Sequence, residues 1–147
     1  MISTPETDPE VASTISEIAS TLLERGVVPA YDVPNFIANR IGAYSLMLTL
    51  KVMDESGLGS DEVDSITGYP MGRPSSATFR TLDVVGIDVF LAVVENSLAA
   101  ASDEDEKAVL EPTTYIRELV ERGWVGQKAG SGFYRRVKEA GKSNILA

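Results

Sequence analysis

The chain has 147 residues, of which 44% are hydrophobic and 24% charged, a composition typical of one globular domain rather than of a disordered chain. Its net charge of −9 argues against binding to a nucleic-acid backbone, because counterion release requires clustered lysine and arginine. It contains no histidine and no cysteine, which excludes an imidazole base, a thiol nucleophile, a disulfide and the usual zinc ligands. We therefore expect the chain by itself to carry at most part of an active site, and no metal.

The sequence also predicts where the protein resides. No apolar stretch is long enough to span a membrane. The polar and acidic segment 1–10 lacks the basic start and the apolar centre of a signal peptide. The absence of cysteine fits a reducing compartment. We expect a cytoplasmic protein that binds neither nucleic acid nor membranes.

Residues 1–31 predict a helix followed by a strand. Segment 7–10 (Thr-Asp-Pro-Glu) has the spacing of a capping box with proline in the first turn. Apolar residues then recur at helical spacing before Gly26, which ends the helix: Val11, Ile15, Ile18 and Leu22. The β-branched segment 27–31 predicts a short strand despite its proline. Because no earlier strand precedes it, we expect this strand to be detached, paired with another copy, or recruited by a neighbouring molecule.

Several further helices are predicted in the rest of the chain. Apolar side chains surround nearly the whole circumference of a helix over 35–56, which predicts burial on most sides, in the core or in a subunit interface. The glycine- and proline-rich segment 68–74 more often turns a corner between helices than binds a ligand. Additional helices are predicted to begin at residue 60 and to cover 75–85, 86–101 and 112–122.

Two polar stretches are expected to lie outside these helices. The acidic run 103–106 predicts a solvated surface loop, since it lacks the alternating ligands and the glycine of a calcium site. The polar chain beyond Arg136 is expected to be frayed.

Asn39, one turn into the long apolar helix, is the most informative polar residue. A buried amide without hydrogen-bond partners costs about 1–3 kcal/mol, so Asn39 either ties a loop, which spacing alone favours, or faces a cleft and holds a substrate. In segment 126–134, glycine amides and Lys128 can meet a phosphate or simply pack as a tail. This segment lacks the strand and helix of a dinucleotide fingerprint. Asp83 and Asp88 fit helix termini better than an acid–base pair.

Three segments together resemble one family, the 3-hydroxyacyl-CoA dehydrogenases. Residues 32–40 (D-V-P-N-F-I-A-N-R) look like the family's D-x-P-[GN]-F-I-x-N-R segment. Residues 68–72 (G-Y-P-M-G), with Asp83 and 86–88 (G-I-D), are similar to its G-x-P-M-G…D-x-x-G-x-D block. Residues 126–134 match its closing G-x-K-x-G-x-G-F-Y. The three occur in the family's order, so the set is far more specific than any one of them.

The resemblance implies a mainly α fold, a helical domain like the C-terminal domain of 6-phosphogluconate dehydrogenase. In the family this domain dimerises and closes over acyl-CoA, while an N-terminal Rossmann domain binds NAD. It implies oxidation of (S)-3-hydroxyacyl-CoA to 3-oxoacyl-CoA in fatty-acid β-oxidation. Asn39 matches the substrate-orienting asparagine, and Lys128 matches a lysine that contacts the cofactor. The family's histidine base, its glutamate, a serine and the NAD fingerprint have no counterpart here, so we expect no activity from the chain alone.

On this interpretation residues 1–31 are a remnant of the Rossmann domain, 32–136 the helical dimerisation and substrate domain, and 137–147 a flexible tail. Residues 74–80 resemble members fused to a downstream enoyl-CoA hydratase domain, a further expected partner besides a second copy of the chain. Two alternatives stay open. One is a stand-alone, non-catalytic dimerisation module of the same fold. The other is a domain of the 6-phosphogluconate or 3-hydroxyisobutyrate dehydrogenase relatives, against which the N-R and G-F-Y motifs speak.

Overall fold

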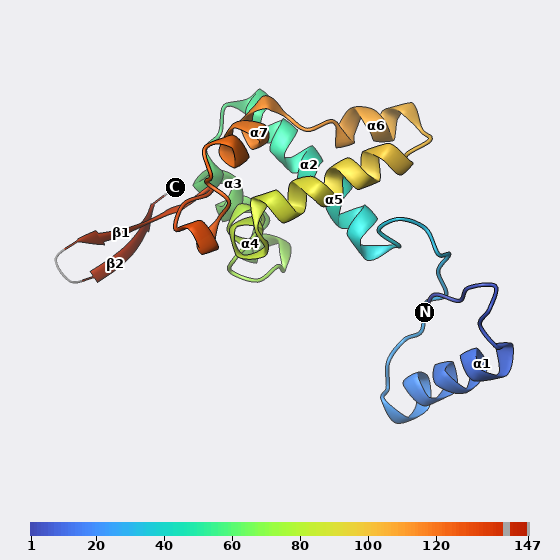
Figure 1. Ribbon diagram of the computed structural model, residues 1–147. Coiled ribbons are helices and arrows are strands. Elements are labelled where there is room, and N and C mark those ends of the chain that lie inside the picture. The colour runs from blue at the N-terminus through green and yellow to red at the C-terminus, as the bar shows by residue number, and fades with distance from the viewer. Residues whose placement is uncertain (140–141, 147) are drawn as a thin grey trace.

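The computed structural model describes residues 1–139 and 142–146. A body of α-helices carries a separate helical segment at one end and a strand hairpin at the other (Figure 1). In chain order the elements are α1 (Pro9–Glu17) with the π-helical turn η1 (Ile18–Leu22), α2 (Ala38–Ser56), α3 (Ser60–Thr67), the 3-10 turn η2 (Tyr69–Met71), α4 (Phe79–Val85), α5 (Ile87–Ala100), α6 (Glu104–Leu110), α7 (Thr114–Glu121), the 3-10 turn η3 (Gln127–Ala129), β1 (Arg135–Glu139) and β2 (Lys142–Leu146).

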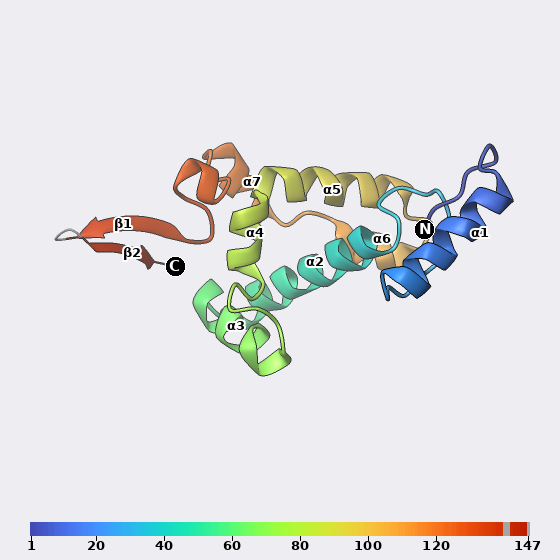
Figure 2. The same cartoon turned by 90° about the horizontal axis from the view of Figure 1, so that it is seen from below.

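The N-terminal segment with α1 lies apart from the helical body in Figure 1, and Figure 2 shows it at the end of the body that carries α6. The Asp8 side chain caps α1 by accepting a hydrogen bond from the Glu10 amide. No residue of α1 or η1 is buried, and Leu22 is 75% exposed. This segment therefore presents an apolar helical face that nothing in the described chain covers.

The predicted strand over 27–31 is wrong as a strand. The structure has only an isolated parallel bridge between Ile2 and Ala30 there. The Ala30 amide donates to the Met1 carbonyl at 2.8 Å, and the Met1 amino group donates to the Val28 carbonyl at 2.6 Å. One bridge gives too few ladder hydrogen bonds to form a sheet. The arrangement, a short extended piece, a helix and a parallel extended piece, nevertheless has the order of a βαβ unit.

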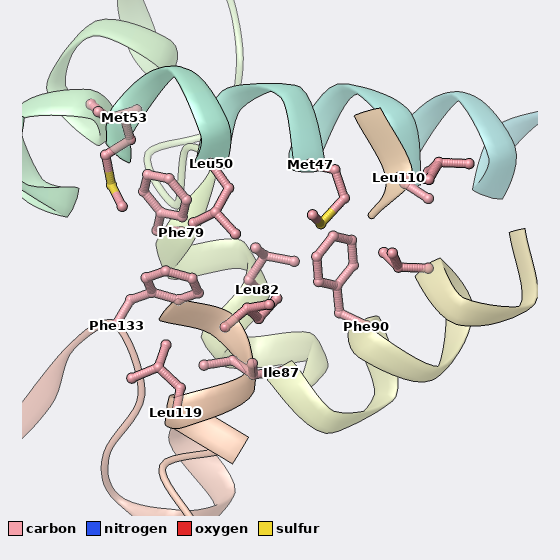
Figure 3. Packing of buried hydrophobic residues seen from close by; sticks show 14 of the residues in the cluster. Met47, Leu50, Met53, Phe79, Leu82, Ile87, Phe90, Leu110, Leu119 and Phe133 are labelled. Atoms are coloured by element: carbon pink, nitrogen blue, oxygen red, sulfur yellow. The ribbon is translucent and has the colours of Figure 1, made fainter. Parts of the chain in front are cut away.

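The core lies where α2 packs against α5 and α6, and where α5 also packs against α4 and α7. Figure 3 shows side chains from these helices and from the C-terminal loop meeting in one cluster. Phe79 of α4 and Phe133 of the loop stack with ring centroids 4.6 Å apart. Through Phe133, this cluster packs the C-terminal loop against the helical body. Its labelled members are Met47, Leu50, Met53, Phe79, Leu82, Ile87, Phe90, Leu110, Leu119 and Phe133.

The long helix α2 is buried on one side only. Ala43, Met47, Leu50 and Met53 face the core. On the other side Ile41, Tyr44, Leu48 and Val52 are between 37% and 65% exposed. The core of the described chain therefore buries one face of α2, and burial of the second apolar face in a subunit interface stays a prediction.

The acidic run 103–106 is not a loop, contrary to the expectation. Asp103 caps α6 by accepting a hydrogen bond from the Glu106 amide, and three acidic residues fill the first turn. Carboxylates are favourable there because they face the positive end of the helix dipole. Leu110 at the other end of α6 is fully buried, which ties this helix to the core.

Beyond Arg136, the described residues 137–139 and 142–146 form strands instead of the frayed tail that we expected, and residues 140–141 and 147 of that expected tail lie outside the described residues. β1 and β2 pair antiparallel, with Arg135 opposite Leu146 and Glu139 opposite Lys142. The pairing depends on backbone hydrogen bonds, which a polar sequence without clear alternation does not reveal. In the part of the chain that the structure describes, no helix combines the length and the apolar character needed to cross a membrane.

Candidate functional site

Asn39 lies in the first turn of α2 and is exposed. Because it is exposed and its side chain makes no hydrogen bond among the described residues, it is not the satisfied core amide that spacing alone favoured. An exposed amide at a helix end can donate to and accept from a bound molecule at the same time. The structure thus leaves Asn39 available to a ligand.

Asn35 anchors the start of α2, a role not predicted from the sequence. Its backbone adopts a left-handed conformation with φ 63°, which asparagine tolerates better than most residues. Its side-chain amide donates to the Ser97 hydroxyl at 2.6 Å and to the Val93 carbonyl at 3.2 Å, both in α5. The signal in the sequence was the asparagine directly after Pro34, a residue type typical of left-handed turns.

Arg40, the residue after Asn39, pairs with Glu106 of α6. Its guanidinium donates from Nε to Glu106 Oε1 at 2.7 Å and from Nη2 to Oε2 at 2.5 Å. This two-pronged pairing raises the pKa of Arg40 and lowers the pKa of Glu106, in both cases chiefly through the side-chain hydrogen bond. The acidic run therefore supplies the ion-pair partner of the N-R segment.

The closing loop is held by Asp83 at the inner side of α4. One carboxylate oxygen accepts the Phe133 amide and the other the Tyr134 amide, both at 2.9 Å. Burial raises the pKa of Asp83, and the two backbone amides partly oppose that shift. A Cβ at Gly126 would meet the Asp83 backbone within 3 Å, and one at Gly132 would overlap the Asp83 carboxylate. The glycines of this motif are therefore required for the close approach of the loop to α4.

Lys128, in η3 of the same loop, contacts the first turn of α5. Its ammonium group donates to Asp88 Oδ1 at 2.6 Å and to Oδ2 at 2.7 Å. Both side chains stay accessible, at 51% and 41% exposed. The hydrogen bond from Lys128 lowers the pKa of Asp88. A Cβ at Gly86 would lie 3.2 Å from the Lys128 ammonium nitrogen, so glycine at this position leaves room for the lysine.

The structure does not bring Asn39 and Lys128 together within one chain. Asn35 meets α5 at Val93 and Ser97, whereas Lys128 meets α5 at Asp88. The nine-residue separation of Asp88 and Ser97 corresponds to about 13 Å along a helix. The two residues thus lie near opposite ends of α5 rather than in a single pocket.

The 68–74 segment forms the corner between α3 and α4. Gly72 adopts φ 70° after the turn η2, and Arg73 donates to the Thr78 hydroxyl at 3.3 Å. Asp64 accepts the backbone amides of Thr78, Phe79 and Arg80 at 2.8–3.0 Å and so ties α3 to the start of α4. Within the described residues, no three acidic side chains gather closely enough to hold a metal ion.

The N-R segment at the start of α2 and the glycine-rich loop packed on α4 define the class of this helical domain. Residues 36–136 match the C-terminal domain of 3-hydroxyacyl-CoA dehydrogenases. The chain is therefore a member of this family, which confirms both the resemblance seen in the sequence and the mainly α fold.

Individual relatives agree with this assignment. The chain is 50% identical over 131 residues to a probable 3-hydroxyacyl-CoA dehydrogenase of Bacillus subtilis, a match that covers 89% of this chain and 16% of that protein. It is 42% identical over 139 residues to a probable 3-hydroxyacyl-CoA dehydrogenase of Deinococcus radiodurans, with 95% and 39% covered. The crystal structure of (S)-3-hydroxybutyryl-CoA dehydrogenase from Ralstonia eutropha superposes with a TM-score of 0.76 at 25% identity, with 93% and 46% covered. The chain thus spans less than half the length of these relatives.

Proposed function

We propose that this chain is the substrate-covering and dimerisation part of an NAD-dependent enzyme that oxidises (S)-3-hydroxyacyl-CoA to 3-oxoacyl-CoA in fatty-acid β-oxidation. The observation that carries the proposal is the exposed Asn39 amide within a chain that belongs to the dehydrogenase family. The reaction removes a proton from the 3-hydroxyl group and a hydride from the carbon that bears it. Asn39 would donate a hydrogen bond to the oxygen as it becomes a carbonyl.

The residues of this chain would supply only a small part of an NAD-binding site. Lys128 is half-exposed on a glycine-rich loop, and its ammonium group, which pairs with Asp88 within the chain, would also reach the diphosphate of a dinucleotide. NAD, when bound, accepts the hydride. The described chain contains no parallel sheet with a glycine-rich turn, so most contacts to NAD would come from a separate Rossmann domain. We therefore assign to Lys128 the role of completing that site from across a domain interface.

Two exposed apolar faces indicate where partners would bind. The outer face of α2, with Ile41 and Val52 at 65% and 53% exposed, would form the seam between two copies of the chain. The apolar face of α1 would pack on the sheet of the Rossmann domain, since the βαβ order of residues 1–31 fits the last unit of such a sheet. A cytoplasmic setting and a fused enoyl-CoA hydratase domain belong to the same proposal.

The test is reconstitution in trans. The chain is mixed with the separately produced N-terminal Rossmann domain of a 3-hydroxyacyl-CoA dehydrogenase, and NADH formation from 3-hydroxybutyryl-CoA is followed by absorbance. We expect turnover in the mixture and none with either component alone. Asn39→Ala should abolish most of it, whereas Asn96→Ala should not, because Asn96 is an exposed helical asparagine on α5.

A mixture that stays inactive would favour a non-catalytic dimerisation module of the same fold. An active mixture that Asn39→Ala leaves unchanged would refute the role given to Asn39. For the cofactor contact, Lys128→Ala should raise the KM for NAD. The control is Lys107→Ala, which removes another exposed, ion-paired lysine.

A further inference from the structure

The first turn of α2 would not hold Asn39 in place by itself. Ile37 is the N-cap residue, and its side chain makes no capping hydrogen bond. The two residues at the entrance, Asn35 and Phe36, both have positive φ angles of 63° and 49°. An uncapped helix end that follows a strained backbone tends to fray. A side chain that must align with a reacting oxygen needs a more rigid support than this.

The structure provides that support from two sides of Asn39. Upstream, the Asn35 amide donates at 2.6 Å to the Ser97 hydroxyl, which is 5% exposed and itself donates to the Val93 carbonyl at 2.8 Å. Downstream, Arg40 pairs with both carboxylate oxygens of Glu106, whose side chain is only 14% exposed. The two anchors lie on different helices, α5 and α6.

Asn39 lies between these anchors and shares in neither. Its side chain stays exposed and makes no hydrogen bond to the described protein. Asn35, four residues before it, is hydrogen-bonded to α5, and Arg40, the residue after it, is ion-paired with α6. The turn that carries Asn39 can therefore neither slide along α5 nor rotate away from α6. The backbone bond from the Ile41 amide to the Ile37 carbonyl, at 3.1 Å, closes this turn.

We infer that Asn35 and the Arg40–Glu106 pair are positioning residues, which hold the Asn39 amide in its working orientation before substrate binds. The inference rests on the role proposed for Asn39. It adds three residues to the site that make no contact with substrate and act only through Asn39. The strained start of α2 is then compensated by hydrogen bonds that also serve the orientation of the amide.

The first test uses the chain alone. Asn35→Gly keeps a backbone that tolerates positive φ and removes the side chain with its amide. By amide hydrogen exchange, we expect the Ile41 amide to exchange at least about fivefold faster in this variant, whereas amides in the middle of α2 keep their protection. Unchanged protection of Ile41 in a folded variant would overturn the inference, whatever the fate of the proposed function.

The second test uses the reconstituted enzyme. We expect Asn35→Gly and Glu106→Gln each to lower kcat by about tenfold or more, with KM for the acyl-CoA changed by less than about threefold. The matched control is Glu104→Gln, in the same first turn of α6 but 85% exposed, which should leave kcat unchanged. Glu106→Gln keeps the shape of the side chain and removes only its charge. If Asn35→Gly fails to fold, the Glu106→Gln variant still tests the inference.

The decisive comparison repeats these substitutions in the Asn39→Ala background. A residue that acts through Asn39 has no further effect once that amide is gone. An additional loss of the same size as in the wild type would show a general structural role and overturn the inference. If Asn39→Ala itself leaves kcat unchanged, the proposed function of Asn39 fails. If only Asn39→Ala lowers kcat, the positioning role alone fails.

Discussion

Replacing Asp83 with asparagine should loosen the closing loop from the helical body. The carboxylate accepts one backbone amide on each oxygen, at 2.9 Å from Phe133 and 2.9 Å from Tyr134. Asparagine keeps one acceptor and turns an NH2 group towards the other amide, which leaves that buried donor without a partner. Such a loss costs about 1–3 kcal/mol. Because burial raises the pKa of Asp83, removing its charge returns part of this free energy, and we expect the lower half of that range.

The measurement is urea unfolding followed by circular dichroism at neutral pH. With a denaturant slope of about 2 kcal/mol/M, a loss of 1–2 kcal/mol lowers the midpoint by about 0.5–1 M. The stacking of Phe133 on Phe79 makes the loop part of the core, so the loss should appear in the global transition. The control is Asp88→Asn, which removes an exposed carboxylate of an ion pair and should shift the midpoint much less. A midpoint for Asp83→Asn that coincides with the control would refute this account of the loop.

Three further outcomes follow from the same contacts. Gly132→Ala should destabilise the chain by more than Asp83→Asn in the same urea assay, because the added Cβ would overlap the Asp83 carboxylate. The control Gly57→Ala has nothing near its added Cβ, so it should cost only the strain of the positive φ angle. Leu110→Ala should cost about 2–5 kcal/mol because Leu110 is fully buried and ties α6 to the core. A change near zero would mean that α6 is not packed on the core. In carbon-13 NMR titrations of the carboxyl groups, Asp83 should titrate above the ordinary aspartate range and Asp88 below it. The raised pKa of Asp83 contributes stability at low pH, which is lost as the pH rises through that pKa. The lowered pKa of Asp88 contributes stability that is lost as the pH falls through that pKa. The reverse order of the two titrations would contradict the assigned contacts.

Much of the family assignment and most helices could be predicted from the sequence. Apolar spacing marks the face of a helix wherever that face is buried, as at Met47 and Leu50 of α2. The glycines at 126 and 132 signalled a loop with special backbone demands, and the structure supplies the reason in their approach to Asp83. Asn39 stood out because an amide is unexpected in an apolar helix. These features are local, so a few neighbouring residues suffice to reveal them.

What the sequence determined by itself was therefore the identity of the parts, the mainly α fold and the two residues proposed to meet substrate and cofactor. Only the tertiary structure decided how those parts are held. Glu106 lies 66 residues from Arg40, and Ser97 lies 62 from Asn35, so no local pattern could have paired them. The acidic run looked like a solvated loop because its role depends on a helix that begins far upstream. Hydrogen bonds and ion pairs between distant residues depend on how the helices pack, and that packing is a property of the whole chain rather than of any one segment.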